Sequence, residues 1–450
     1  MNTARLPLTS IFAITNLPAL LYSVLAMGFM LNTFIGTNPF GAASLEARAE
    51  GNPLDRLVIL GLTGLAMLVL LLNWRELGAI VLRGSGVWLI VGIAIVSIVW
   101  SQHPDLTMRR SILFFCSVII AAGAAVGVKD LSRLHRAFGY FMTAIVLINL
   151  FVIGALPHIG IEALGARGIY SQKNVAGLVA MISMIVMATL IFHRRTGTVE
   201  RFYFICMLGL AFIFLVLTKS KTSLALTVVI LAAIGGLALA EKGGPVLILG
   251  GFLASLLAFM VVLAGAAAFD FDIERIASAL LSDTSFTGRD ELWAFVYRAA
   301  NEYPNIGYGY GAFWDVGIGA DPLQRVEPGA WLGEVAPGVI NQAHNGYLDL
   351  WVQLGLPAML LGVATVLFAI IVGCVAVYLL PRGHRDRIAL VTMVAILVVY
   401  LLHNLTESSL FARGLILCNV TLPVLFILAR LQNILGALND SNGPIKREYV

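Results

Sequence analysis

The chain has 450 residues, of which 59% are hydrophobic and only 12% are charged, and its formal net charge is +4. A soluble domain carries about 25% charged residues, so this chain has too few polar side chains to cover a water-soluble surface. The composition excludes an ordinary soluble enzyme, and the small, dispersed positive charge gives no support for nucleic-acid binding.

Long apolar runs recur along the whole chain. A helix that crosses a membrane needs about 20 predominantly apolar residues, and this criterion predicts about twelve spans. They lie near residues 11–31, 57–73, 87–100, 111–127, 138–156, 174–193, 202–218, 223–240, 245–268, 357–380, 387–404 and 412–433. We therefore expect an all-α polytopic membrane protein. Spans 1–9 would occupy residues 1–268, spans 10–12 would occupy residues 346–433, and a cytoplasmic tail would follow at 434–450.

The distribution of basic residues predicts the orientation. Short cytoplasmic loops carry an excess of Lys and Arg. With the N-terminus in the cytoplasm, the inward segments hold more than half of the 29 Lys and Arg residues, and the outward segments hold most of the acids. This predicts that the long hydrophilic segment 269–345 faces away from the cytoplasm.

The segment 269–345 is predicted to contain short helices. Thr287 can cap a helix that Pro304 ends, and a second helix should begin after Asn345. The run Gly307–Gly311 lacks the preceding strand of a dinucleotide site, so we expect a flexible turn there. A segment of this length is too long for a mere connection and is expected to have a function.

Unusual polar side chains gather near the outward ends of the predicted spans. Ionisable groups beside hydrocarbon are costly and are therefore functional candidates, although long basic side chains can also extend to the interface without a further role. The candidates are Arg109, Arg110, Arg167, Lys173, Asn174, Lys219, Lys221, Arg289, His344, Asn345, His403, Glu407 and Arg413.

Five of these residues give specific hypotheses. Lys221 lies in a tight outward turn against the charge bias, and Arg289 lies in the first turn of a helix, where a cation opposes the macrodipole and suggests an anionic partner. His344 precedes a helix N-terminus, which favours a neutral imidazole that can accept a proton. Glu407 is a second candidate base, or it pairs with Arg413, and His403 is expected to be buried structure.

Several cations and a histidine on one membrane face fit a lipid-linked pyrophosphate as substrate. Arg and Lys can hold its phosphates, and a neutral His or a carboxylate can take the proton of an attacking hydroxyl. We assign Arg289, Lys221, Arg110, Lys173 and Arg167 as candidate pyrophosphate ligands, with His344 and Glu407 as candidate catalytic residues. No His, Cys or acidic residues have metal-ligand spacing, so we expect no metal and no cofactor.

Several motifs resemble the bacterial O-antigen ligase and polysaccharide polymerase family. They are Trp100–Arg110, Ser171–Asn174, Ser220–Thr222, Thr287–Trp293, Gly307–Trp314 and His344–Leu348. The Gly311–Trp314 run and Asn404–Glu407 are most similar to its exopolysaccharide polymerase branch.

The resemblance implies a metal-independent, inverting glycosyltransferase of the C-type membrane fold, in the bacterial inner membrane, with its active site facing the periplasm. Its donor would be an undecaprenyl-pyrophosphate-linked oligosaccharide, and its acceptor a growing polysaccharide or another glycan. Membrane lipid, a chain-length regulator and export proteins are further expected partners. Carried over by motif, Arg289 and Lys221 would bind pyrophosphate and His344 would serve catalysis. The family usually has Arg where this chain has Lys221, and lysine cannot make the planar bidentate contact.

Three functions remain open on the sequence. The leading hypothesis is a polymerase that joins repeat units, and the alternative is a ligase that transfers finished glycan to lipid A core or another acceptor. A transporter of the lipid-linked saccharide is the third, although the sequence shows neither the inverted repeats nor the midplane polar sites of secondary transporters.

Overall fold

The computed structural model describes residues 17–39, 51–193, 196–243, 285–326, 331–335 and 338–440. The α-helices within these ranges are α1 Leu17–Phe34, α3 Pro53–Leu72, α4 Leu77–Arg83, α5 Ser85–Val96, α6 Pro104–Gly127, α7 Leu131–Ala155, α8 Pro157–Gly160, α9 Lys173–Phe192, α10 Thr198–Thr218, α11 Lys221–Gly243, α14 Ser285–Glu302, α15 Gly346–Leu354, α16 Leu356–Leu379, α17 Arg387–His403 and α18 Ile416–Asp440.

Short elements connect them. The strands β1 Ile161–Glu162 and β2 Gly165–Ala166 form an antiparallel pair in which Ile161 faces Ala166. The 3-10 helices are η1 Trp74–Glu76, η2 Ser97–Val99, η3 Ile318–Ala320, η4 Pro322–Arg325 and η5 Trp331–Glu334. The chain is thus all-α apart from one small hairpin in the described ranges.

The apolar helices confirm the predicted class. Among the described residues, seven helices are long and apolar enough to cross a membrane, or eight if the pair Trp74–Arg83 and Ser85–Val99, bent by 75°, is one span. Three shorter apolar helices, Lys221–Gly236, Arg387–His403 and Ile416–Leu431, lie where spans were predicted. The total of twelve is not confirmed, and the predicted span 245–268 lies outside the described residues.

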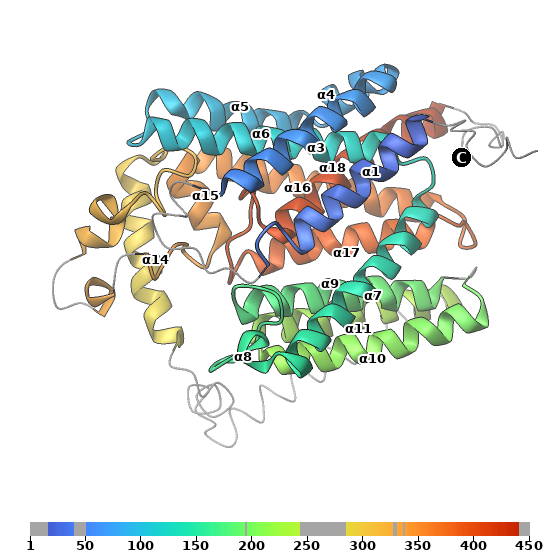
Figure 1. The fold of residues 1–450 in the computed structure, drawn as a ribbon. Helices are drawn as coiled ribbons and strands as arrows, with labels where there is room; N and C mark the ends of the chain where they lie inside the picture. Colours follow the sequence, from blue (N-terminus) through green and yellow to red (C-terminus); the bar gives the residue numbers. More distant parts are fainter. Residues whose placement is uncertain are drawn as a thin grey trace, which may run out of the picture.

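The long helices lie side by side in a bundle (Figure 1). In this view α3, α5 and α6 are above, α1, α16, α17 and α18 are in the middle, and α7, α9, α10 and α11 are below. Helix α9 packs against α7, α10, α11 and α17, and it is buried over most of its length. A helix that is apolar on all sides is either buried in the protein or surrounded by lipid, and α9, which is rich in Ala, Val, Ile, Leu and Met, is buried.

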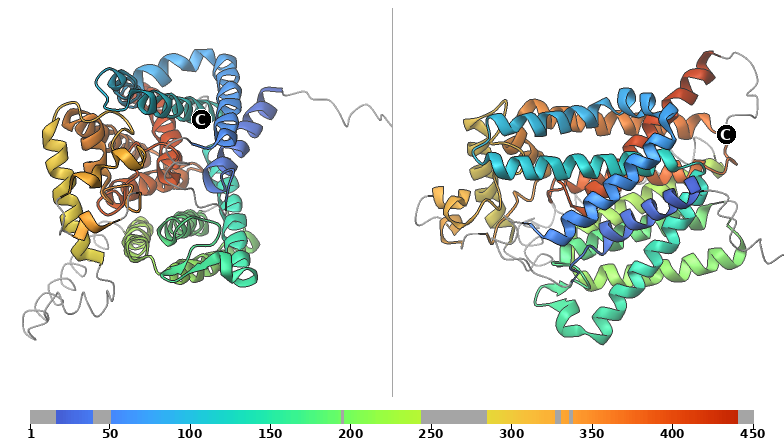
Figure 2. Two further views of the ribbon diagram at one scale, coloured as in Figure 1. Left: turned by 60° about the vertical axis from the view of Figure 1, so that its left-hand side comes forward. Right: turned by 45° about the horizontal axis from the view of Figure 1, so that its top comes forward.

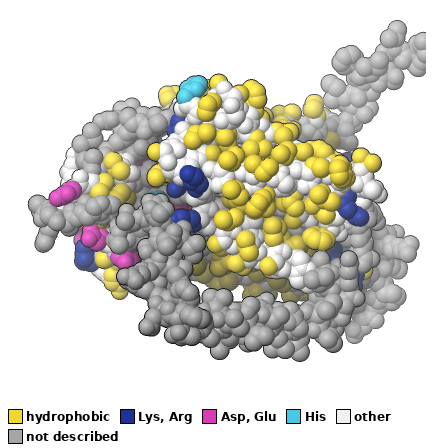
Figure 3. Space-filling view, turned by 90° about the horizontal axis from the view of Figure 1, so that it is seen from below, with side chains coloured by type: hydrophobic (Ala, Val, Ile, Leu, Met, Phe, Trp, Pro, Cys, Tyr) yellow, Lys and Arg dark blue, Asp and Glu magenta, His cyan; other side chains and the backbone are white. Residues whose placement is uncertain are grey.

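The outer helices expose apolar side chains instead. Viewed from below, a broad apolar face lies between two ends that carry Lys and Arg (Figure 3). Large exposed apolar residues of α10 and α11 include Phe202, Ile205, Phe212, Ile213, Val216, Val228 and Val229. Such a continuous apolar surface is unstable in water and fits contact with lipid.

The two ends of the bundle differ. One end carries α14, α15 and η3–η5, and the last turns of α18 lie at the other (Figures 1 and 2). We call the first the loop end. Helix α14 packs on α15, and their apolar side chains share a small core that includes Phe295, Val296, Phe313 and Val352. Within the predicted segment 269–345, the described residues 285–326, 331–335 and 338–345 therefore belong to a packed layer at this end of the bundle.

Two details of this layer differ from expectation. Helix α14 begins at Ser285, two residues before the predicted cap Thr287, so Arg289 lies one turn inside the helix and the macrodipole argument for an anionic partner is weakened. The run Gly307–Gly311 is packed rather than flexible. An added Cβ at Gly309 would strike the Ser101 side chain, and all three glycines of the run have positive φ.

Candidate active site

The turn after α17 positions Glu407 at the loop end. The buried Asn404 donates from Nδ2 to the Tyr400 carbonyl at 2.6 Å and accepts from the Ser409 amide at 2.7 Å, which fixes the turn. The Gly346 amide donates to the carbonyl oxygens of Asn404 at 2.9 Å and Glu407 at 3.1 Å. The turn is therefore joined directly to the first residue of α15.

His344 is held next to this turn. Asn345 caps α15, the helix predicted to begin after it, because its Oδ1 accepts from the amides of Tyr347 at 3.1 Å and Leu348 at 3.2 Å. The Asn345 amide in turn donates to Ser408 Oγ at 3.0 Å. His344 itself has a φ of 50°, a left-handed conformation that is uncommon for residues other than Gly and that clusters at functional sites.

His344 and Glu407 form a hydrogen-bonded pair. Nδ1 of His344 lies 3.1 Å from Oε2 of Glu407. The other oxygen, Oε1, accepts from Asn174 Nδ2 at 2.7 Å and lies 3.8 Å from Arg289 Nη2. Glu407 thus pairs with Arg289 and His344, and the expected alternative pairing with Arg413 is not formed among the described residues.

The surroundings keep Glu407 ionised. Burial alone would raise its pKa, but the hydrogen bond from His344 and the charges of His344, His403 and Arg289 outweigh burial, so the pKa of Glu407 lies below its ordinary value. An ionised carboxylate only accepts hydrogen bonds, so it requires a proton on Nδ1 of His344. In the neutral ring Nε2 then carries the lone pair, and this nitrogen can take a proton.

The site is accessible on the histidine side. The side chain of His344 is 27% exposed, that of Arg289 is 19% exposed and that of Glu407 is 9% exposed. A buried carboxylate behind a partly exposed imidazole is the arrangement in which the carboxylate orients the ring and the ring meets substrate.

Three of the other predicted cations lie at the same end, Lys221 at the start of α11 and Lys173 and Arg167 beside the β1–β2 hairpin. Lys221 is exposed at the first position of α11, and the preceding Ser220 packs against Gly177 of α9, one turn from Asn174. Lys173 donates from Nζ to the Leu164 carbonyl at 3.3 Å. Arg167 likewise donates from Nε to the Ile159 carbonyl at 2.8 Å, so both side chains contact the backbone around the β1–β2 hairpin.

Arg110 binds the backbone of the segment Gly311–Asp315, at the end of the packed glycine run. Its guanidinium donates to the carbonyl oxygens of Gly311, of Trp314 at 2.9 Å and of Asp315 at 2.7 Å. These contacts join the start of α6 to a segment about 200 residues later in the chain. Arg110 therefore orders the wall of the site as well as carrying charge.

A cavity of about 1060 Å³ adjoins the histidine and glutamate pair. Gln342 and Gly346, which flank His344, and Ser408, which follows Glu407, all line it. Its charged lining includes Arg56, Arg109, Arg110, Arg413, Asp55, Asp315 and Asp349. Arg56 and Asp349 were not among the residues singled out from the sequence, although Arg56 near the outward start of a span has the same unfavourable placement as Lys221.

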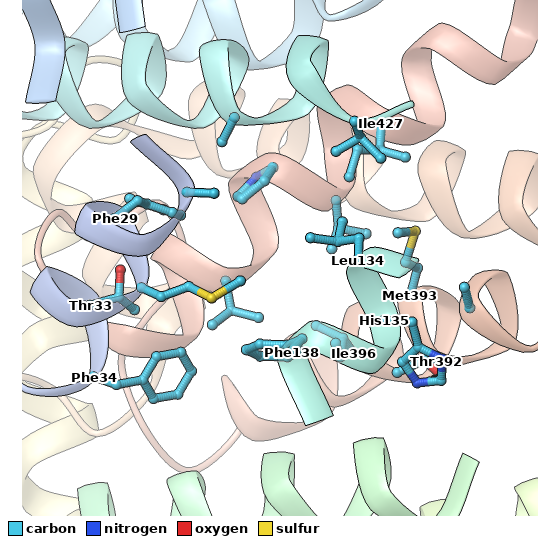
Figure 4. Close-up of a pocket in the computed structure, with 18 of the residues that line it drawn as sticks. Phe29, Thr33, Phe34, Leu134, His135, Phe138, Thr392, Met393, Ile396 and Ile427 are labelled. Carbon is cyan, nitrogen blue, oxygen red and sulfur yellow. Dashed lines mark hydrogen bonds between the residues drawn. The ribbon is translucent and has the colours of Figure 1, made fainter. Parts of the chain in front are cut away.

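A second cavity is different in character. It is lined by apolar side chains from α1, α7, α17 and α18, among them Phe29, Phe138, Ile396 and Ile427 (Figure 4). Its volume is about 110 Å³, and its one ionisable group besides Tyr22 is His135. His135 belongs to a buried polar contact with Thr189 at 3.0 Å and Thr392 at 3.1 Å, so this cavity offers no constellation for group transfer.

Comparison with known proteins supports the motif resemblance. Residues 206–363 match the O-antigen ligase family model. The chain is 24% identical over 349 residues to the exopolysaccharide production protein ExoQ of Rhizobium meliloti (strain 1021), covering 76% of this chain and 73% of the relative. The expected resemblance is thereby confirmed, and it indicates a membrane enzyme related to O-antigen ligases and to exopolysaccharide production. The family segment includes Lys221, Arg289 and His344 and ends before Glu407.

Proposed function

We propose that this protein is a polymerase of lipid-linked oligosaccharides, an inverting glycosyltransferase that uses an undecaprenyl-pyrophosphate-linked donor without a metal. The observation that carries the proposal is the hydrogen bond between His344 Nδ1 and Glu407 Oε2, with Arg289 beside the same carboxylate. A proton acceptor and a cation for a leaving group therefore meet at one end of an apolar helix bundle.

His344 is the general base in this proposal. A hydroxyl of the acceptor sugar donates its proton to Nε2 while its oxygen attacks the anomeric carbon of the donor. Glu407 holds Nδ1–H and stabilises the imidazolium that forms, and it stays ionised throughout. Asn174 and Arg289 satisfy the second carboxylate oxygen, which keeps the carboxylate oriented toward the ring.

Arg289 stabilises the leaving group. As the new bond forms on one face of the sugar, the bond from the anomeric carbon to pyrophosphate breaks on the opposite face, and its electron pair passes to the phosphate oxygen. Undecaprenyl pyrophosphate leaves with a charge that a nearby guanidinium can meet in bidentate fashion. Lys221 is the second proposed pyrophosphate ligand, from the exposed start of α11.

The remaining predicted ligands are assigned differently. Arg110 and Arg167 donate to backbone carbonyl oxygens, so we propose that they position the loops that surround the substrate. Lys173 shares the helix start that presents Asn174 to Glu407, and we propose that its ammonium adds to the attraction for the donor phosphates.

Polymerase and ligase differ in the acceptor. Similarity to an exopolysaccharide production protein favours polymerisation, whereas the O-antigen ligase match makes a ligase the second candidate. The purified protein in lipid vesicles, given only the lipid-linked repeat unit, should produce chains of increasing length. Product that appears only after a separate glycolipid acceptor is added would identify a ligase, and movement of intact donor across the vesicle membrane without a new glycosidic bond would identify a transporter.

A further inference from the structure

Four arginines from distant parts of the sequence line the larger cavity. Arg56 comes from the first turn of α3, Arg109 and Arg110 from the second turn of α6, and Arg413 from the segment before α18. Arg289 does not belong to this lining. The loop end therefore carries a second concentration of cations beside the one that meets Glu407.

Arg413 is positioned by its backbone. The Arg413 amide donates to Tyr310 Oη at 3.1 Å, and Tyr310 Oη donates to the Phe411 carbonyl at 2.9 Å. The Tyr310 ring stacks on Phe114 with ring centroids 5.1 Å apart. A cation held on such a rigid support loses little conformational freedom when a ligand binds.

Among the residues that line the cavity, the four arginines accompany three aspartates, Asp55, Asp315 and Asp349. Asp349 is buried and accepts from Trp314 Nε1 at 2.6 Å and from the Ala343 amide at 2.9 Å, and burial raises its pKa. Burial lowers the pKa of Arg413, and the charges of Arg109 and Arg56 add to that effect against the opposing influence of Tyr310 and Asp315. The arginines thus repel one another across the cavity, which an anion would relieve.

The cavity is large enough for glycan as well as an anion. Its volume of about 1060 Å³ is at the upper limit of sites for small ligands, about 300–1,000 Å³. It lies beside the proposed catalytic pair, because Gln342, Gly346 and Ser408 belong to its lining, although the side chains of His344 and Glu407 do not. A sugar hydroxyl inside it is therefore close to the proposed base.

We infer that this cavity is the acceptor site, and that Arg56, Arg109 and Arg413 bind an anionic group of the acceptor glycan. The inference rests on the proposed glycosyl transfer and adds a charge requirement for the acceptor. The anion is a phosphate or carboxylate group, supplied either by the pyrophosphate of a second lipid-linked oligosaccharide or by an acidic sugar. Planar guanidinium groups bind both in bidentate fashion.

Binding of inorganic pyrophosphate tests the site without catalysis. The full-length protein in detergent would carry Arg289→Ala and Lys221→Ala, which remove the two proposed pyrophosphate ligands of the donor, and Arg56→Gln and Arg413→Gln would be added together. Saturable binding should weaken about tenfold or more on loss of two charge-assisted contacts. Arg298→Gln, which changes an exposed arginine of α14, is the matched control and should bind normally. Unchanged affinity in a variant that elutes as a folded monodisperse protein would overturn the inference.

Transfer kinetics identify the source of the anion. With Arg289 and Lys221 restored, Arg56→Gln/Arg413→Gln should raise the acceptor KM about tenfold while the donor KM stays unchanged. If the anion is pyrophosphate, the effect appears with a lipid-pyrophosphate-linked acceptor and is absent with the same glycan lacking pyrophosphate. If it is an acidic sugar, both acceptors are affected equally.

An acceptor KM that does not change with either would contradict the inference. Absence of transfer by the unsubstituted protein would instead count against the proposed function, with the pyrophosphate measurement unaffected.

Discussion

Glu407 and His344 are 63 residues apart in the sequence, yet Glu407 Oε2 lies 3.1 Å from His344 Nδ1. The two residues lie next to different helices, since Glu407 is in the turn after α17 and His344 precedes α15. The Gly346 amide donates to the carbonyl oxygens of Asn404 and Glu407 in this turn, and these bonds hold Glu407 next to His344. An added Cβ at Gly346 would collide with the Asn404 side chain, so this close approach requires glycine.

Replacing His344 with Gln should separate binding from turnover. Gln keeps hydrogen-bonding capacity but cannot take the hydroxyl proton, so transfer should fall by about 10²–10⁴-fold with donor binding retained. Product formation in vesicles and binding of a labelled lipid-linked donor would be measured together. His158→Gln changes an exposed histidine of α8 and should remain active. A His344→Gln enzyme of normal rate would exclude this residue as the base.

Glu407→Gln should impair the same step while leaving donor affinity largely intact. The amide removes the negative charge that stabilises the imidazolium, so we expect roughly a hundredfold loss in kcat. Glu407→Asp, which keeps the charge on a shorter side chain, should retain more activity than Gln. If Glu407→Gln is fully active while His344→Gln is not, the carboxylate has no part in the mechanism.

The stability of the protein should depend on Glu407 in acid. Its pKa is lower in the folded chain than the ordinary value of 4.5, so its contribution to stability is present above the unfolded pKa. That contribution is lost as the pH falls through the lower folded pKa. Thermal unfolding in detergent between about pH 6 and pH 3 should therefore show a shallower acid dependence for Glu407→Gln than for the unsubstituted protein. The control Glu291→Gln, at an exposed position of α14, should behave like the unsubstituted protein.

The two proposed pyrophosphate ligands should respond differently to conservative changes. Arg289→Ala and Lys221→Ala should each abolish polymer formation in a membrane-inserted protein, because the leaving-group charge is no longer met. Lys221→Arg should be tolerated, since the charge is kept and the planar group adds contacts. Chain length of the product on gels is the readout, with Arg298→Ala as the matched control. Near-normal polymer from Arg289→Ala would refute the pyrophosphate assignment.

Polymer formation should be independent of divalent metal. We expect guanidinium and ammonium groups to take the place of a metal at the pyrophosphate, so EDTA should leave the rate in vitro unchanged. Activity that stops with EDTA and returns with added Mg²⁺ would contradict the expectation.

The loop end should face outward in intact cells. A cysteine at Val339, which is 68% exposed, should react with an impermeant thiol reagent, whereas one at Val199, which is 85% exposed at the other end of the bundle, should react only after lysis. The four native cysteines would first be replaced. Labelling with the opposite pattern would reverse the predicted orientation.

The sequence by itself determined the class of protein and the ends of many helices. Apolar runs and capping residues such as Asn345 act through neighbours a few positions away, so their effect is readable along the chain. For the same reason the candidate cations could be recognised from their unfavourable positions near the outward ends of spans.

Only the tertiary structure decided which of these residues act together. Glu407 pairs with His344 and Arg289, Arg110 binds the carbonyl oxygens of the Gly311–Asp315 segment, and Arg56 joins the lining of the larger cavity. Each contact depends on how helices pack, and a change of helix rotation would replace one partner by another without altering any local pattern. Hydrogen bonds and charges act over a few ångströms in space, whereas the residues that make these contacts are separated by 63 to more than 200 positions in the chain.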